Sequence, residues 1–437
     1  MQKQVKYRIR RATIGTSITF HESDIVDGSA ADLKYVLYTY NLGTDFYTTM
    51  EYDKDTGMCS VPSGSWTKLR IKELQDDRYY GPTQDFSCDI VLKPQQQEIA
   101  DKLLQPEKLF GGLIQAPCGF GKTYLGTYLI GNHKKPALIV CHTKLLAYQW
   151  LGVLKKHISG TEIGLVGDGV ENIQPITVGI YKSLLTRLDK LQDKFEVMIV
   201  DESHLCVAST FSKVVNGINC KTKLALTATP TRKDGLHVTL PDYFSPNFLI
   251  AKDTDKITPR VEIQKTSVPF RVLNPKRDWT KQLTRLASND SYLKLIAEKA
   301  RDKIAHGRCI LILSERVDML EQLQALIPRS TLLVGKTSNS NREEILENAG
   351  TKYDAILSTK IFDEGISCHR LDTLFITCPG NNTAKLEQRI GRIQREHPDK
   401  KDPLIVDFWL QGPIVARQQM NRLEWFKKQN FILDKQL

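Results

Sequence analysis

Cysteine is sparse in this chain of 437 residues, and its nine copies never form a Cys-x-x-Cys pair. The sequence therefore lacks the spacing of a zinc site and the pattern of a disulfide framework. It also has no run of about 18 apolar residues, so it predicts no membrane-spanning helix and no membrane partner. The basic N-terminus has no apolar stretch behind it, which argues against a secretory signal. We therefore expect a cytoplasmic protein in a reducing environment.

Acidic residues are fewer than basic ones, which leaves a formal net charge of +11. Residues 1–90 hold 11 lysines and arginines against 13 aspartates and glutamates, whereas the remaining residues hold 50 against 37. The basic excess therefore lies after residue 90. It favours a polyanion partner such as nucleic acid, although many soluble proteins are mildly basic.

One stretch, residues 115–123, reads Gln-Ala-Pro-Cys-Gly-Phe-Gly-Lys-Thr and lies between an apolar run and a helix-like run. Glycines let successive backbone amides face one anion, and the N-terminus of the next helix adds partial positive charge. Lys122 is expected to reach the β- and γ-phosphates of a nucleotide, and the Thr123 hydroxyl to hold Mg²⁺. A chance glycine-rich turn is the alternative for this stretch alone. The expected nucleotide contacts are Ala116 (in place of the usual first glycine), Pro117, Cys118, Gly119, Phe120, Gly121, Lys122 and Thr123.

Two carboxylates follow a mostly apolar run at residues 195–200. An ATPase needs one carboxylate to hold Mg²⁺, which we assign to Asp201, and another to orient and deprotonate the attacking water, which we assign to Glu202. Upstream, Gln96 opens an expected helix, and its amide suits the two hydrogen bonds that amides form with adenine. Two adjacent glutamines leave that choice open.

A basic cluster at residues 388–395 supplies a third part of such a site. Arg392 and Arg395 are three residues apart and share one helical face. A solvated basic face is the plain interpretation; the functional one is a pair of arginines that reach across a cleft to the γ-phosphate, with Gln388 as a further nucleotide contact. The expected catalytic residues are Lys122, Asp201, Glu202, Arg392 and Arg395.

Strand-like and helix-like runs alternate from residue 136 to residue 230, and each apolar run ends in a polar cluster. This pattern is typical of a parallel α/β sheet with its chemistry at the carboxyl ends of the strands. A proline-containing connector, residues 245–275, leads to a second α/β unit that ends in a helix at about 413–430. The expected strands are 137–141, 177–183, 195–200 and 223–226 in the first unit, and 309–313, 330–334, 355–358, 373–377 and 403–408 in the second.

The first 88 residues predict a small α+β or mainly β accessory domain. Residues 5–9, 34–40 and 46–52 are expected strands, because they alternate or are rich in aromatic and β-branched residues, and residues 76–84 look like a linker. A loop places Trp66 beside Lys68 and Arg70, a combination that can stack on bases and meet phosphates. A core position for Trp66 is the alternative. The predicted domains are thus 1–88, which we expect to bind duplex or junction DNA, 89–250 and 251–437.

The order of these motifs resembles that of superfamily 2 helicases over residues 96–395. The matching segments are 116–123 (motif I), 142–150 (Ia), 201–204 (II), 226–230 (III), 358–367 (V) and 388–395 (VI). The resemblance implies two tandem RecA-like parallel-sheet domains, and ATP and Mg²⁺ as cofactors. Residues 92–96, 149–150 and 229–235 are similar to the XPB/RecG-like group. Phage recombination helicases of the UvsW type, which act on forked and branched DNA, resemble the chain in size and in their small N-terminal domain.

The same resemblance assigns residues to the nucleic-acid track or to its coupling with ATP. Motif II reads Asp-Glu-Ser-His rather than Asp-Glu-Ala-Asp, which leans away from the RNA-clamping group, and Ser367 stands where many relatives carry Asp. Phosphate contacts would make binding independent of base sequence and sensitive to salt. The expected nucleic-acid or coupling residues are Thr143, Lys144, His204, Thr227, Thr229 and Thr359, with Trp66 in the accessory domain.

The motifs and this resemblance together predict an ATP-dependent DNA helicase that remodels forked, branched or partly single-stranded DNA in recombination, repair or replication. The resemblance implies that it moves 3′ to 5′, as its relatives do. A duplex translocase without strand separation and an RNA helicase remain open. The complete set of Glu202, Arg392 and Arg395 argues against a mere ATP-gated binding module. No nuclease-like cluster of carboxylates with lysine is visible. If a phage encodes the protein, we expect it in the host cytoplasm.

Overall fold

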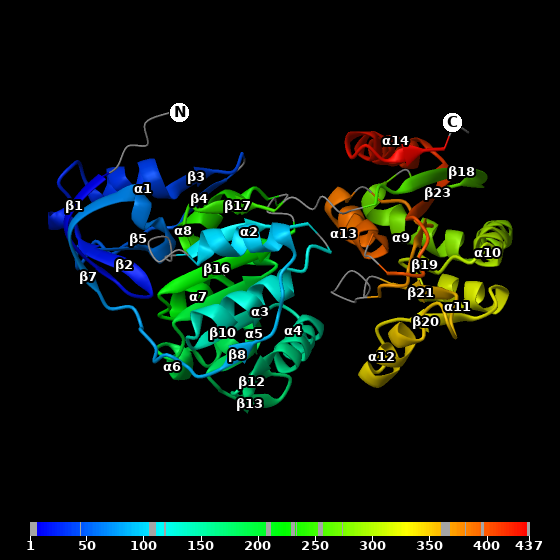
Figure 1. Ribbon diagram of the computed structural model, residues 1–437. Helices are drawn as coiled ribbons and strands as arrows, with labels where there is room; N and C mark the ends of the chain where they lie inside the picture. The colour runs from blue at the N-terminus through cyan, green and yellow to red at the C-terminus, as the bar shows by residue number, and fades with distance from the viewer. Residues whose placement is uncertain are drawn as a thin grey trace. The chain divides into compact units, whose positions relative to one another are not determined.

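The computed structural model describes residues 7–43, 45–104, 111–117, 119–206, 211–228, 232, 234–251, 257–272, 274–359, 368–380, 382–394 and 397–434. The chain divides into two compact units, Met1–Asp253 and Thr254–Leu437 (Figure 1). Within these described ranges, no helix is long and apolar enough to cross a membrane.

The N-terminal part of the first unit is a five-stranded sheet in the order β5-β6-β2-β1-β7. Its strands are β1 (Tyr7–Ile14), β2 (Ser17–His21), β5 (Glu51–Tyr52), β6 (Met58–Pro62) and β7 (Leu69–Asp76), and a hairpin of β3 (Thr39–Asn41) and β4 (Phe46–Thr48) lies beside them. The prediction of a strand at 34–40 is wrong, because α1 (Ala30–Tyr38) occupies most of it. Ser29 and Asp32 form a capping box that starts this helix, and Leu33 and Tyr38 are buried.

The larger part of the first unit is an eight-stranded sheet in the order β13-β12-β14-β10-β15-β16-β9-β17. Neighbouring strands pair in parallel, apart from β12 with β13. Those strands are β9 (Gly111–Gln115), β10 (Ala137–Cys141), β12 (Ile163–Gly167), β13 (Val170–Asn172), β14 (Ile176–Ile180), β15 (Val197–Asp201), β16 (Thr222–Thr227) and β17 (Phe248–Ile250). The four strands predicted for this part are confirmed, except that the one predicted at 177–183 ends at Ile180, where α5 (Tyr181–Leu185) begins.

Alternate residues of these strands point to opposite faces of the sheet and pack against a layer of helices on each face. In β10, Ile139 and Cys141 pack under α2 (Pro94–Leu103), α3 (Lys122–His133) and α4 (Lys144–His157). Leu138 and Val140 face the other way, toward a core that includes α7 (Phe211–Gly217) and α8 (Leu240–Phe244). The sheet is thus buried on both faces (Figure 1), which explains its nearly continuous apolar strands.

The N-terminal sheet is joined to the larger sheet by buried polar contacts. Asp242 of α8, fully buried, accepts hydrogen bonds of 2.6 Å from Tyr40 and Thr49 and pairs with Lys68 at 2.5 Å. Lys223 of β16 donates to Ser63 at 3.1 Å. These contacts make the N-terminal sheet part of one compact unit with the first helical layers.

The predicted linker at 76–84 forms no helix or strand after Asp76, but it packs against the first unit. Arg78 is buried and donates to the carbonyl of Lys221, and the Gly81 amide donates to Glu196 at 2.9 Å. Just beyond, β8 (Ser87–Cys88) pairs with β11 (Ile158–Ser159). The segment therefore packs along the larger sheet because its backbone groups find buried partners there.

The second unit is a seven-stranded sheet in the order β20-β21-β19-β22-β23-β18-β24, and its neighbours pair in parallel. Its strands are β18 (Arg260–Pro269), β19 (Ile310–Leu313), β20 (Ser330–Leu333), β21 (Ala355–Ser358), β22 (Thr373–Ile376), β23 (Leu404–Gln411) and β24 (Ile432–Leu433). Its helices are α9 (Pro275–Ala287), α10 (Asp290–Ala305), α11 (Val317–Leu326), α12 (Asn339–Glu347), α13 (Thr383–Ile393) and α14 (Pro413–Lys428). All five strands predicted here, and the last helix, are confirmed.

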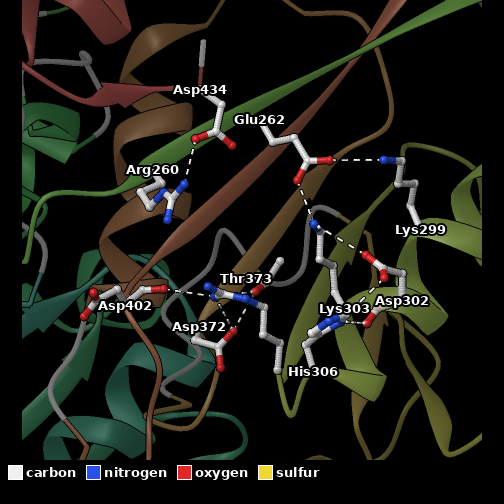
Figure 2. Close-up of polar contacts among 11 residues, drawn as sticks. Arg260, Glu262, Lys299, Asp302, Lys303, His306, Asp372, Thr373, Asp402 and Asp434 are labelled. Atoms are coloured by element: carbon white, nitrogen blue, oxygen red, sulfur yellow. Dashed lines mark hydrogen bonds and ion pairs between the residues drawn. The ribbon is translucent and has the colours of Figure 1, made fainter. Parts of the chain in front are cut away.

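Residues 245–275 are not a simple connector, because they contain β17 and the ten-residue β18. Figure 2 shows how charged side chains fix β18: Glu262 lies between Lys299 and Lys303 of α10, at 3.2 and 2.7 Å, and Arg260 pairs with Asp434 at 2.9 Å. The prolines at 259 and 269 stand just before and at the end of this strand, where they do not interrupt it.

Candidate active site

The carboxyl ends of four neighbouring strands bring the predicted motifs of the first unit to one sheet edge. The strand order β10-β15-β16-β9 places the ends at Cys141, Asp201, Thr227 and Gln115 next to one another. Because the strands are parallel, the segments that follow them emerge on the same side. Segments as distant in sequence as 116–123 and 201–204 are therefore adjacent through the topology.

The loop after β9 has the backbone that its glycines predict. Gly119 and Gly121 have φ values of 92° and 85°, in the left-handed region that favours glycine. Ala116 is fully buried and its amide donates to the carbonyl of Thr227 at 2.9 Å, while Phe120 lies in the apolar core. The methyl group of Ala116 is thus accommodated where glycine is usual.

Lys122 begins α3, and its Nζ donates to the carbonyl of Ala116 at 3.1 Å, so the side chain folds over the loop. Thr123 is half-buried on the first turn of the same helix, and Pro117 lies in the loop. Cys118 lies outside the described residues. The loop therefore presents an amine, a hydroxyl and a helix N-terminus at one place, which suits a nucleotide phosphate.

Gln96 is buried and ties the loop to α2. Its Nε2 donates to the carbonyl of Phe120 at 2.6 Å, and its Oε1 accepts from the amide of Lys93 at 2.9 Å. A Cβ on Gly121 would stand 2.5 Å from Gln96 Nε2. The amide that we expect to contact adenine thus also positions the phosphate loop.

The two carboxylates differ in their hydrogen bonds. Asp201 is buried, and its Oδ2 accepts from Trp150 Nε1 at 2.9 Å while its Oδ1 accepts from the amide of Glu202 at 2.9 Å. Glu202 has a left-handed backbone, with φ 49°, and its Oε2 lies 3.4 Å from His204 Nδ1. Trp150 is a site residue whose role the sequence did not reveal; a tryptophan in an amphipathic helix signals only a core position.

The electrostatics separate the two carboxylates further. Burial and the negative charge of Glu202 raise the pKa of Asp201 above its ordinary value. Burial acts in the same direction on Glu202, but the contact with His204 and the positive charge of Lys122 outweigh it and lower the pKa of Glu202. Glu202 is therefore held ionised, as a proton acceptor must be, while Asp201 sits where added positive charge would be favourable.

Mg²⁺ fits this arrangement. Within the described ranges, no three or more His, Cys, Asp or Glu side chains gather as a metal site. Mg²⁺ in nucleotide sites commonly uses only one or two protein oxygens, and nucleotide phosphates and water complete its shell. A buried carboxylate with a raised pKa and a hydroxyl on the phosphate-binding helix are such ligands, so Asp201 and Thr123 would hold the ion.

His204 links this pair to the next strand. Its Nδ1 lies 3.2 Å from the hydroxyl of Thr227, and its carbonyl accepts from Arg232 Nη1 at 2.9 Å. Arg232 also pairs with Asp234 at 2.5 Å. These contacts join motif II to the segment after β16, the position expected of coupling residues; Thr229 lies outside the described residues.

The other expected nucleic-acid residues are placed as follows. Thr143 caps α4, its hydroxyl accepting from the amide of Leu146 at 3.3 Å, and Lys144 pairs with Asp168. Trp66 packs partly buried against the core of the N-terminal sheet, which favours the core interpretation, and Lys68 is taken up by Asp242. Of the three residues expected to contact nucleic acid in this loop, only Arg70 is exposed.

In the second unit, Thr359 follows β21 directly and is half-buried. Gln388 and Arg392 lie one turn apart on α13, and Arg392 is only 8% exposed, so it is not on a solvated helix face. Arg395 and residues 360–367, including Ser367, lie outside the described residues. β21 and the strand before α13 are parallel, so Thr359 and the start of α13 share the carboxyl edge of this sheet.

Two family models match the chain. The model described as type III restriction enzyme, res subunit, matches residues 89–232, and the one described as helicase conserved C-terminal domain matches residues 290–397. A variant of S. cerevisiae Dbp5 bound to RNA and ADP BeF3 superposes with a TM-score of 0.58 at 14% identity, covering 79% of this chain and 94% of that one. At this identity the likeness concerns the fold, which is that of two RecA-like domains.

Several curated proteins are similar in sequence. A probable helicase of Escherichia phage T5 is 29% identical over 72% of this chain and 71% of its own length. The DNA 3'-5' translocase XPB2 of Sulfurisphaera tokodaii is 27% identical over 77% and 85%. A putative ATP-dependent RNA helicase of Acanthamoeba polyphaga mimivirus is 25% identical over 100% and 88%. The matched models fall on both α/β units, and the chain is thus a superfamily 2 helicase with two RecA-like domains, a nucleic-acid-dependent ATPase.

Proposed function

We propose that the chain is an ATP-dependent DNA helicase that translocates 3′ to 5′ and remodels forked and branched DNA, in the manner of UvsW-type phage enzymes. The observation that carries the ATP-driven part is the meeting of the Lys122 loop and the Asp201–Glu202 pair at one sheet edge. The choice of DNA is supported by the relatives, which include a DNA 3'-5' translocase and a phage helicase.

In this proposal the chain's own residues divide the work of ATP hydrolysis. Lys122 and the loop amides bind the phosphates, and Thr123 and Asp201 hold Mg²⁺, which neutralises charge on the nucleotide. Glu202 orients the attacking water and accepts its proton. Arg392 and Arg395 stabilise the charge that develops on the γ-phosphate, and Gln96 and Gln388 contact the nucleotide.

Removing single groups tests these roles. Lys122→Ala should abolish ATP binding and activity. Arg392→Ala or Arg395→Ala should leave ATP affinity nearly intact and lower turnover by roughly 10³-fold if either arginine acts fully on the γ-phosphate. An Arg392→Ala enzyme with normal turnover would exclude Arg392 from the mechanism.

The N-terminal sheet offers a candidate DNA contact on two of its strands. The parallel register of β1 and β7 sets Arg8 opposite Arg70, and Arg10 and Lys72 follow two positions further along. These side chains are exposed; Arg8 is bidentate with Asp27, and Lys72 lies 3.9 Å from Glu73. Like charges opposite one another are unfavourable by themselves, whereas a phosphate backbone would neutralise them.

This contact predicts that Arg70→Ala together with Arg10→Ala weakens DNA binding and flattens its dependence on salt. Lys54→Ala, an exposed lysine in a turn of the same sheet, serves as the control. Equal affinities and equal salt slopes for both variants would remove the N-terminal sheet from the DNA interface.

The decisive substrate experiment compares a labelled four-way junction, a forked duplex and a blunt duplex with ATP. Conversion of junction and fork with little blunt-duplex unwinding is the result expected of a branch-remodelling helicase. The second candidate is a duplex translocase, favoured by the relative named as a translocase; it would hydrolyse ATP on all three without separating strands. ATP hydrolysis stimulated by RNA alone would instead indicate an RNA helicase.

A further inference from the structure

A buried ion pair joins the last helix of the second unit to the strand before it. Arg422 of α14 is 5% exposed and Asp407 of β23 is fully buried. The guanidinium donates twice to the carboxylate, from Nε at 3.0 Å and from Nη2 at 2.7 Å, and Trp409 Nε1 donates to the same carboxylate at 3.1 Å. Such a two-point contact fixes the plane of the guanidinium.

The remaining arm of Arg422 reaches a loop rather than the sheet. Nη1 donates to the carbonyl of Gly380 at 3.0 Å. Gly380 lies between β22 and α13, two residues before Asn382, whose side chain caps α13. Near the start of the same loop, Tyr292 donates to the carbonyl of Thr377 at 2.6 Å. The loop that leads into α13 is thus held at both ends.

Stability alone does not account for this pair. Replacing a buried ion pair with well-packed apolar side chains is often neutral or stabilising, because both charges must be desolvated. α14 already packs through Val415, Leu423 and Phe426. An apolar side chain cannot form a directed hydrogen bond with the Gly380 carbonyl. We therefore interpret the ion pair as a means of orienting this hydrogen bond.

We propose that Arg422 is a positioning residue for ATP hydrolysis, which sets the start of α13 and thereby the placement of Arg392. This rests on the proposed function, in which Arg392 acts on the γ-phosphate. A helix moves as a rigid rod, so a shift at Asn382 is carried along α13 to Arg392. Arg422 and Asp407 both lie beyond residues 290–397, the segment that the helicase C-terminal model matches.

The test uses the full-length protein and its nucleic-acid-stimulated ATP hydrolysis. Arg422→Gln should lower kcat by roughly 10²-fold, the effect of misplacing a catalytic group by about 1 Å, with KM for ATP nearly unchanged. Arg422→Lys keeps the charge but loses the fork, and should also lower kcat. The matched control is Arg417→Gln, an exposed arginine on the same helix, which should behave as wild type.

Arg422→Gln leaves Asp407 buried without its cation, and that variant is open to unfolding. The paired change Arg422→Met with Asp407→Leu removes both charges, so it should keep the melting temperature while still losing the Gly380 contact. A wild-type kcat in this folded pair would overturn the proposal.

A double-mutant cycle separates positioning from general structure. If Arg422 acts through α13, adding Arg422→Met and Asp407→Leu to Arg392→Ala should lower kcat by a much smaller factor than the same two changes cause in the wild type, with the remaining loss arising from Gln388 on the same helix. Independent, multiplicative losses would reject the role of Arg422 and leave that of Arg392 standing. Normal turnover of Arg392→Ala alone would reject the role of Arg392 and, with it, the proposal for Arg422.

Discussion

At the residue scale, the backbone of Glu202 marks the point where hydrolysis would be driven. A left-handed conformation is uncommon for a residue other than glycine and costs roughly 1 kcal/mol or more, so the surrounding structure must enforce it. The amide of Glu202 donates to Asp201, and its side chain faces His204. The left-handed backbone of Glu202 is therefore associated with the position of its carboxylate beside Asp201 and His204.

We expect Glu202→Gln to bind ATP as wild type does and to hydrolyse it more slowly by roughly 10² to 10⁴-fold, because an amide cannot accept the proton. ATP affinity is measured by fluorescence, and the turnover rate by steady-state ATP hydrolysis. Together the two measurements separate binding from hydrolysis. Glu171→Gln, which alters a surface carboxylate paired with Arg187 and Lys190, is the control. Normal turnover in Glu202→Gln would refute the assignment.

A second residue-scale prediction concerns Lys223, whose amine is buried beneath the N-terminal sheet. Burial lowers the pKa of Lys223 from 10.5 to about 8. Between these values the unfolded chain holds a proton that the folded chain has lost, so the free energy of unfolding rises with pH, by up to about 3 kcal/mol from this residue. Below pH 8 both states are protonated and the dependence vanishes.

Urea unfolding of wild type and Lys223→Met between pH 7.5 and about 10 measures this effect as the difference between their slopes. Lys213→Met, a change at an exposed lysine, should retain the wild-type slope. Parallel curves for wild type and Lys223→Met would show that the amine does not titrate in this window.

Residue chemistry was largely predictable from sequence where the backbone itself carries the signal. The left-handed backbone of Gly119 and Gly121 follows from the loop pattern, because few other residues adopt it readily. The phosphate contact of Lys122 stays a prediction. Lys68 was not predictable in the same way. Its partner Asp242 is distant in sequence, and an isolated basic side chain looks the same whether it meets a phosphate or a buried carboxylate.

At the element scale, the contact between the helical turn Ser63–Lys68 and α8 decides how the two sheets of the first unit fit together. A Cβ on Gly64 would stand 2.6 Å from the backbone nitrogens of Phe244 and Ser245. Gly64→Ala must push these elements apart, so we expect the free energy of unfolding to fall by about 1–3 kcal/mol.

Gly152→Ala provides a change of the opposite sign. Gly152 lies inside α4 with nothing within 4 Å of an added Cβ, so alanine should stabilise by about 0.5–1 kcal/mol through helix propensity. Thermal melts of the two variants compare one methyl group in two settings. A stabilised Gly64→Ala protein would mean that the contact between the turn and α8 is loose.

Elements whose apolar residues follow the pattern of a buried strand or helix were predictable from sequence. Elements that depend on a capping residue, or on partners distant in the sequence, were not. The buried strands at 137–141 and 355–358 are read directly from sequence because both faces are apolar. α1 looked like a strand because Tyr35, Val36 and Tyr38 favour strands, yet the Ser29–Asp32 capping box starts a helix. β18 carries charged side chains that its distant partners explain: Glu262 pairs with Lys299 and Lys303 of α10. Arg260 pairs with Asp434.

At the scale of the whole molecule, the N-terminal sheet is part of the first compact unit and is not a separate domain on a flexible linker. The chain divides into its two compact units after residue 253, near the predicted boundary at 250. Residues 1–88 do not form a compact unit of their own in this division. The sequence suggested a separate accessory domain, because the short strand-like runs of residues 1–88 differ from the alternating strands and helices that follow. Such local patterns do not report the buried surface that unites two sheets.

Truncation tests this view of the molecule. Removing residues 1–85 deletes Lys68, Tyr40 and Thr49, the partners of Asp242, and exposes to water the surface of α8 and β16 that the N-terminal sheet covers. We expect the shortened chain to melt well below the full-length protein and to be cut by protease within the first unit. A fragment with the full-length melting temperature would instead establish an independent accessory domain. Because of this coupling, lost activity after truncation would not identify a DNA contact, so the role of the N-terminal sheet must be judged from surface variants such as Arg70→Ala, which leave the buried pair in place.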